Sequence, residues 1–86
     1  MTKNKPMKGI VELDIHHMNA YQAKVAIDTG LKRANQSIYR IRIIHGYHSG
    51  TTLKELIAKE YSKHQNVIRL EQGQNEGITE LVLREL

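Results

Sequence analysis

Residues 41–52, IRIIHGYHSGTT, carry an apolar strand that runs into a glycine-containing turn and then into the start of a helix. Gly46 and Gly50 bracket a short segment that needs an irregular backbone, and Thr51 or Thr52 can cap the helix that follows. Such a turn aims backbone N–H groups, backed by the positive end of a helix dipole, at an anion such as phosphate. The stretch lacks the lysine of a Walker loop, and a plain connecting turn would show the same pattern.

The segments on either side of this stretch show clear periodicity. Residues 10–16 alternate between apolar and polar side chains, which predicts a strand with one buried face, and Asn19 is a suitable N-cap for the helix that follows. The predicted elements are a strand over residues 10–16, a helix over 19–35, a strand over 38–44, a helix over 53–64, and strands over 67–71 and 78–83. The order is therefore β-α-β-α-β-β.

This order predicts an α/β (α+β) fold, a two-layer sandwich in which two helices cover one face of a mixed four-stranded sheet. A right-handed β-α-β crossover makes the first two strands parallel. The other face of the sheet is expected to stay partly open, because alternation places polar side chains on it: Glu12, Asp14, His16, Arg40 and Arg42. Ligands of parallel strands bind at their carboxyl ends, so the segments 14–16 and 45–46 should meet at one edge.

Length and composition indicate one small domain. We expect a flexible basic arm over residues 1–9, with Lys3, Lys5 and Lys8, and a folded domain over residues 10–86. The chain has no cysteine, which excludes disulfides and leaves the redox compartment open. Its first eight residues contain no apolar segment and no apolar run is long enough to span a membrane, so we expect a cytoplasmic protein. The net charge of +4, concentrated in the arm and the middle of the chain, favours a polyanionic partner, although a solvated surface would look the same.

Two histidine-containing segments are the candidates for chemistry. Asp14 and His16 are two residues apart on one strand face, which suits a carboxylate that orients an imidazole for proton transfer; a surface hydrogen-bonded pair is the alternative. His45 either contacts phosphate or closes the strand by bonding to backbone. Asp14, His16, His45 and His48 carry side chains that suit zinc or manganese, but no helical spacing fixes their geometry. We therefore predict no metal site and no required cofactor, while a divalent metal remains compatible with the pattern.

The two segments resemble the signatures of the small MutS-related (Smr) domain. The family has L-D-x-H at the end of its first strand and H-G-x-G, followed by a small residue and glycine, after its second. Here residues 13–16 read LDIH and residues 45–50 read HGYHSG, about thirty residues apart as in the family. The glycine-containing turn over residues 73–77, just before Thr79, fits as well. The resemblance covers roughly residues 10–84.

The resemblance implies a sandwich similar to the C-terminal domain of bacterial translation initiation factor three, in a short stand-alone protein. It also implies nucleic-acid binding, often with endonuclease activity on branched or supercoiled DNA or on RNA. The candidate catalytic residues are Asp14, His16 and His45. The candidate nucleic-acid or phosphate-binding residues are Gly46, Tyr47, His48, Ser49, Gly50, Thr51, Arg40 and Arg42.

One position departs from the family pattern, because His48 stands where the second signature has its second glycine. Two classes of function therefore follow. The first is an endonuclease, and the second is a non-catalytic nucleic-acid-binding module whose loop is altered at His48; an adaptor that recruits a partner is a third. We expect DNA or RNA as the partner, no membrane, and a monomer. The sequence does not separate DNA from RNA, since it has no ribbon of stacking aromatic residues and no base-reading motif.

Overall fold

The first half of the chain forms a right-handed β-α-β unit. The computed structural model describes residues 8–47 and 50–85, so residues 1–7 of the predicted arm, His48 and Ser49 lie outside the described part. β1 (Ile10–Asp14) and β2 (Arg40–Ile44) are parallel neighbours, joined by α1 (Ala20–Arg33). Their register sets Leu13 opposite Ile43 and Asp14 opposite Ile44, so the two strands end side by side.

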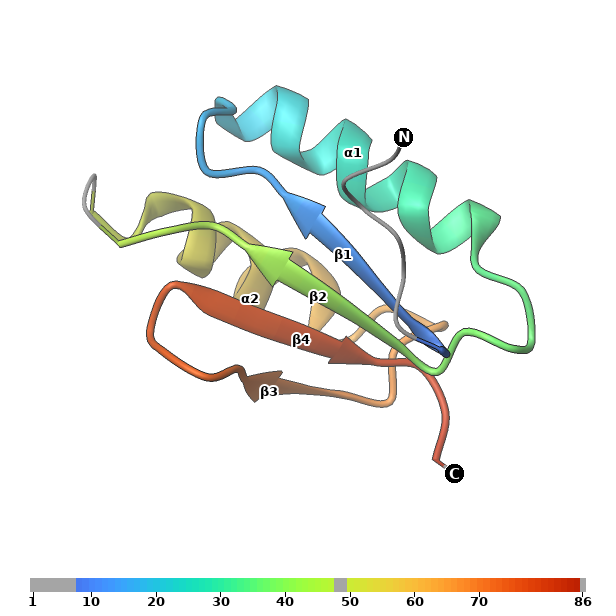
Figure 1. Ribbon diagram of the computed structural model, residues 1–86. Coiled ribbons are helices and arrows are strands. Elements are labelled where there is room, and N and C mark those ends of the chain that lie inside the picture. Colours follow the sequence, from blue (N-terminus) through green and yellow to red (C-terminus); the bar gives the residue numbers. More distant parts are fainter. Residues whose placement is uncertain (1–7, 48–49, 86) are drawn as a thin grey trace, which may run out of the picture.

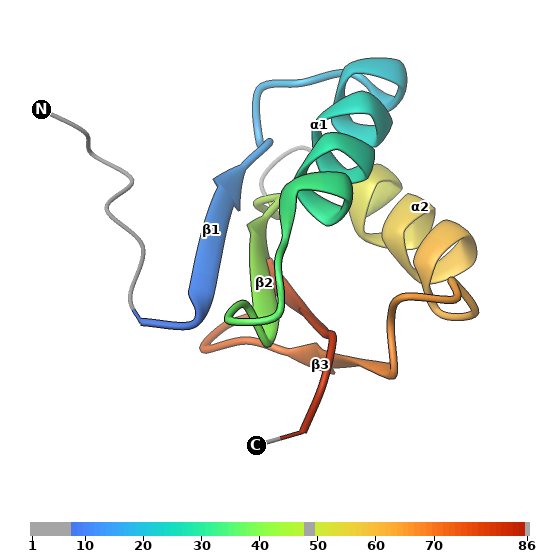
Figure 2. The same cartoon turned by 90° about the vertical axis from the view of Figure 1, so that its right-hand side faces the viewer.

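The second half completes a mixed four-stranded sheet. α2 (Thr52–Tyr61) leads into β3 (Arg69–Gln72) and β4 (Ile78–Val82), and β4 pairs antiparallel with both β2 and β3. The strand order is β1-β2-β4-β3, and both helices lie on one face of the sheet (Figures 1 and 2). This confirms the predicted two-layer fold and the parallel pairing of the first two strands.

Local sequence explains why α1 forms where it does. Asn19 accepts a hydrogen bond from the backbone N–H of Gln22 at 2.8 Å, and the Gln22 side chain accepts one from the N–H of Asn19 at 3.0 Å. This reciprocal capping box satisfies two N–H groups that the first helical turn leaves unpaired. Ala23, Ile27 and Leu31 follow at four-residue spacing and are all buried, so one stripe of the helix faces the sheet.

The core lies between the helices and the covered face of the sheet. It contains Ile41 and Ile43 from β2, Leu81 from β4, and Ile57 and Tyr61 from α2, all of them buried. The alternation predicted for β2 is confirmed, because its arginines lie on the opposite, open face. Neither helix in the described part of the chain is long and apolar enough to span a membrane.

The ends of several elements differ from those predicted. β1 ends at Asp14 instead of His16, because the Asp14 carboxylate accepts the backbone N–H of His16 at 3.2 Å and turns the chain out of the sheet. α2 ends at Tyr61, three residues before the predicted end. Thr51 is the N-cap residue of α2, but its hydroxyl donates to Glu55 at 2.9 Å instead of capping a backbone group.

Candidate functional site

Asp14 and His16 form a hydrogen-bonded pair where β1 ends. Oδ1 of Asp14 bonds both to the backbone N–H of His16 and to Nδ1 of its ring. Burial raises the pKa of the Asp14 carboxyl group, but the hydrogen bonds from His16 outweigh this and lower its pKa below the ordinary value. An ionised carboxylate on Nδ1 keeps the proton on that nitrogen and leaves Nε2 to act on a substrate. Both side chains are partly exposed, so a ligand can reach them.

His45 occupies a very different environment, since it is only 5% exposed. Its Nδ1 lies 2.9 Å from the carbonyl of Gly46, which can only accept, so Nδ1 donates there. Nε2 is then the acceptor for the hydroxyl of Thr79 at 2.8 Å. Burial lowers the pKa of His45, the charge of Lys54 adds to this, and the Gly46 carbonyl opposes it. Both ring nitrogens are therefore used within the protein by a neutral imidazole.

The backbone at His45 and Gly46 is held by the turn that joins β3 to β4. The N–H groups of His45 and Gly46 donate to the carbonyl of Gly77 at 2.9 and 3.0 Å. Gly46 has a φ of +76°, and a Cβ there would come within 3.3 Å of the Cβ of His16. A Cβ on Gly77 would meet the ring of Tyr47 at 2.7 Å. The two glycines let the loop pack against both His16 and the start of β4.

A cleft of about 550 Å³ lies beside His16 and His45. Its lining residues are His16, His17, Met18, Asn19, Ala20, His45, Gly50, Thr52 and Leu53. Both helices begin at this cleft, at the same edge where β1 and β2 end (Figure 1). The hydroxyl of Thr51 does not cap the first turn of α2, and backbone N–H groups at such a helix start can bind an anion. The cleft therefore combines an oriented imidazole with two positive helix ends.

The structure thus brings together one part of the predicted site. Asp14, His16, His45, Gly46 and Gly50 lie at the same edge of the sheet. Tyr47 is exposed and covers Gly77, while Thr51 precedes α2. The predicted contributions of His48 and Ser49 fall outside the described residues. The sequence did not single out Asn19, Thr79 or Gly77 as parts of the site. Asn19 was recognised only as a helix N-cap, Gly77 only as part of the glycine-containing turn, and Thr79 only as a residue that follows this turn.

Arg40 and Arg42 lie on the open face of the sheet and are paired with carboxylates. Arg40 bonds to Glu71 at 2.8 Å and also to Glu80, and Arg42 bonds to Glu80 at 2.8 Å. Glu12 lies 3.8 Å from Arg42. These ion pairs balance the charge of both arginines within the sheet. Their predicted phosphate contacts stay a prediction, which the pairing does not favour.

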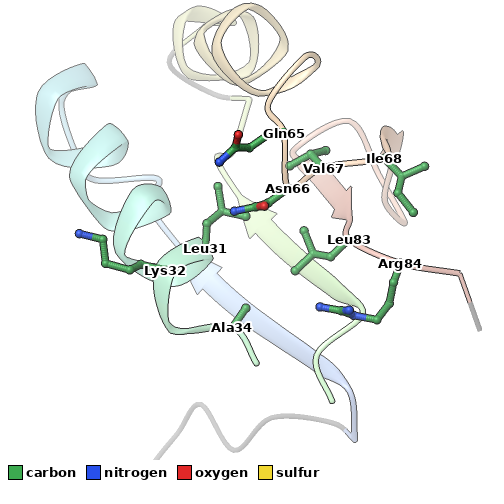
Figure 3. A pocket seen from close by; sticks show the side chains of 9 residues that line it. All are labelled: Leu31, Lys32, Ala34, Gln65, Asn66, Val67, Ile68, Leu83 and Arg84. Atoms are coloured by element: carbon green, nitrogen blue, oxygen red, sulfur yellow. The ribbon is translucent and has the colours of Figure 1, made fainter. Parts of the chain in front are cut away.

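Two further observations concern ligands. In residues 8–47 and 50–85, no cluster of three or more histidine, aspartate or glutamate side chains could hold a metal ion. A second hollow, of about 660 Å³, lies where α1 and β4 end, with Lys32 and Arg84 at its rim and the side chains of Gln65 and Asn66 above it (Figure 3). Because no carboxylate or imidazole lines it, this hollow offers no acid–base chemistry.

The fold and the cleft define a class of protein: a small α+β domain that presents a carboxylate-oriented histidine at one edge of a mixed sheet. The family model of the Smr domain matches residues 13–82, and the chain belongs to this family. A similar solved structure is the Smr domain of MutS2 from Thermus thermophilus, with a TM-score of 0.77, 20% sequence identity, and coverage of 86% of this chain and 98% of that one. No curated protein matches the sequence. The family expected from the two signatures is thus confirmed.

Proposed function

We propose that this Smr domain binds nucleic acid and cleaves phosphodiester bonds at the cleft beside His16. The observation that carries the proposal is the Asp14–His16 pair at the place where both helices begin. A phosphate in the cleft would accept hydrogen bonds from the first turn of α2, and the helix dipoles would stabilise its negative charge. Membership of the Smr family supports nucleic acid as the partner.

In this mechanism Nε2 of His16 takes a proton from the attacking hydroxyl group, which belongs to water or, in RNA, to the neighbouring ribose. The oxygen attacks phosphorus, the bond from phosphorus to the leaving oxygen breaks, and the leaving oxygen takes up a proton from water. The His16 imidazolium then returns its proton to the solvent. Asp14 stabilises the imidazolium that forms and holds the ring in place. His45 acts as a positioning residue, because its two bonds fix the loop that packs against His16. We therefore propose a positioning role for His45 in place of the catalytic role predicted from the sequence.

A second candidate function is a nucleic-acid-binding module without cleavage. One observation favours it: His45 is occupied by Gly46 and Thr79, so among the described residues of the cleft only His16 has an imidazole held by a carboxylate. His48, where the family signature has glycine, stands between His45 and Gly50 in the sequence, outside the described residues. The cytoplasmic location and the monomeric state expected from the sequence remain predictions.

Direct assay of cleavage separates the two functions. Pure protein is incubated with supercoiled plasmid and with single-stranded RNA, each with added divalent metal and with a chelator. We expect Asp14→Asn and His16→Ala each to lower the cleavage rate by about 100-fold or more while binding and melting temperature are retained. Glu12→Gln is the matched control, since it removes a carboxylate from the same strand face and should cut at the wild-type rate.

Each outcome has a definite meaning. Binding without cleavage of either substrate under all conditions would establish the non-catalytic module. Wild-type cleavage by His16→Ala would remove the proposed mechanism. Absence of nucleic-acid binding by the wild-type protein would overturn both functions.

A further inference from the structure

An apolar shelf is exposed on the outer side of the first turns of α1. Tyr21 is 77% exposed and Val25 is 47% exposed, and their four-residue spacing puts them on the same side of the helix. Together with Met18 and Ala26 they line a hollow of about 510 Å³ whose walls are mainly apolar. Two of the four large hydrophobic side chains exposed in the described part of the chain thus lie together. Such an exposed group is typical of a binding surface.

The shelf continues directly from the candidate cleft. His17 and Met18 line both hollows, and Tyr21 follows Ala20, which lines the cleft. The rings of His16 and His17 lie 3.6 Å apart between centroids. A nucleic-acid strand with a phosphate bound at the start of α2 would therefore pass His16 and then reach the shelf. The part of the nucleotide that would lie on the shelf is its base.

We propose that the shelf binds an unpaired base that flanks the phosphate in the cleft, with Tyr21 as its stacking platform. This inference rests on the proposed function and adds the class of substrate: single-stranded or locally unpaired nucleic acid. Aromatic side chains stack on bases of any identity, but a base inside a duplex is already stacked on its neighbours and cannot reach the shelf. No lysine, arginine or carboxylate lines the shelf, so it suits a flat, uncharged ring better than a second phosphate.

The test uses short single-stranded oligonucleotides of RNA and of DNA that contain 2-aminopurine, and duplexes of the same sequences. Binding is measured in the Asp14→Asn background, which prevents cleavage during the measurement. We expect Tyr21→Ala to weaken single-strand binding by about 5-fold to about 150-fold, the range for loss of one stacked base, and to remove the quenching of 2-aminopurine fluorescence. Duplex binding should stay within about twofold.

Two variants serve as controls for this substitution. Tyr21→Phe keeps the ring and should retain single-strand affinity within about twofold. Ile68→Ala removes a half-exposed apolar side chain from the other end of the sandwich (Figure 3) and should also have no effect. Because Tyr21 is largely exposed and alanine favours helix, the melting temperature of Tyr21→Ala should match that of the wild type.

The outcomes separate this inference from the proposed function. Cleavage by the wild type with unchanged single-strand binding in Tyr21→Ala would overturn the inference alone. Equal losses for single strand and duplex would also overturn it, as would a dimer that dissociates on Tyr21→Ala without any change in oligonucleotide binding. Loss of single-strand binding in Tyr21→Ala, with no cleavage by the wild type, would support the base platform and overturn the endonuclease. A wild type that binds no oligonucleotide would overturn both.

Discussion

At the scale of single residues, the environment of each histidine decides its chemistry. His16 is partly exposed and bonded to a carboxylate, so one nitrogen remains for a substrate. His45 is buried and bonded through both nitrogens to Gly46 and Thr79, so it behaves as a structural group. The two histidines thus occupy different environments at one edge of the sheet, and burial is the main physical difference between them.

The lowered pKa of His45 predicts a stability change with pH. The unfolded chain binds a proton near the ordinary value of 6.5, whereas burial in the folded state disfavours the charged ring. The contribution of His45 to the free energy of unfolding is therefore complete above pH 6.5 and is lost as the pH falls through the lower, folded pKa. At about pH 5.5 this loss is at most about 1.4 kcal/mol.

Urea unfolding of wild type and His45→Asn at about pH 7.5 and about pH 5.5 measures this contribution. The wild type should lose more stability than the variant between the two values, because the other histidines are common to both proteins and carboxyl groups titrate mainly below this window. An equal loss in both proteins would contradict the assignment of His45 as a buried neutral ring.

At the scale of elements, the sandwich is held by apolar packing and by polar contacts between the helices. The hydroxyl of Tyr61 donates to the carboxylate of Asp28 at 2.6 Å, which ties α2 to α1. Burial and this carboxylate raise the pKa of Tyr61, so the hydroxyl keeps its proton and the link persists at neutral pH. β2 lies between β1 and β4 and carries two isoleucines under the helices.

Ile43→Ala should be among the most damaging substitutions in β2. Ile43 is fully buried, so the change removes apolar contacts and leaves a cavity, at a cost of about 2 to 4 kcal/mol in the free energy of unfolding. A domain of this size has little stability to spare. Ile68→Ala, a half-exposed isoleucine before β3, should cost much less. Equal melting temperatures for the two variants would refute the placement of Ile43 under the helices.

At the scale of the whole molecule, the two faces of the sheet carry different kinds of side chain. One face is apolar and covered by helices. The open face carries ion pairs that link all four strands; their members are Glu12, Arg40, Arg42, Arg69, Glu71 and Glu80. Burial raises the pKa of Glu80, but the two arginines outweigh it and keep the carboxyl group ionised. Positive charge on this face is therefore largely balanced.

Arg42→Ala tests whether this face is structural or binds phosphate. Glu80 is only 7% exposed, so loss of one arginine should lower the free energy of unfolding by about 1 to 2 kcal/mol. The slope of log affinity for RNA against log salt concentration should stay unchanged. Arg33→Ala, an exposed cation at the end of α1, should leave stability unchanged. A flatter salt slope with Arg42→Ala would instead show that the open face contacts phosphate, as the sequence first suggested.

Much of the fold follows from the sequence alone, because its signals are local. Alternation around Leu13 and Ile43 specified the strand faces, four-residue spacing from Ala23 specified the inner side of α1, and Asn19 marked where that helix begins. The β-α-β order then required parallel strands, which brought the two signature segments to one edge. The Asp14–His16 pair depends on no long-range contact, because its two residues are only two positions apart in the chain.

Only the tertiary structure decided which distant residues become partners. Thr79 bonds to His45 and Glu80 to Arg42 because β4 lies beside β2, an order that the periodicity of neither strand reveals. That pairing brings Thr79 to His45 and balances the charge of the arginines, which does not favour the phosphate contacts predicted for Arg40 and Arg42. The position of the apolar shelf next to the candidate cleft likewise depends on the assembled fold, since His17 and Met18 line both hollows. Hydrophobic pattern sets what each element buries, whereas hydrogen bonds and ion pairs between elements depend on their assembled positions.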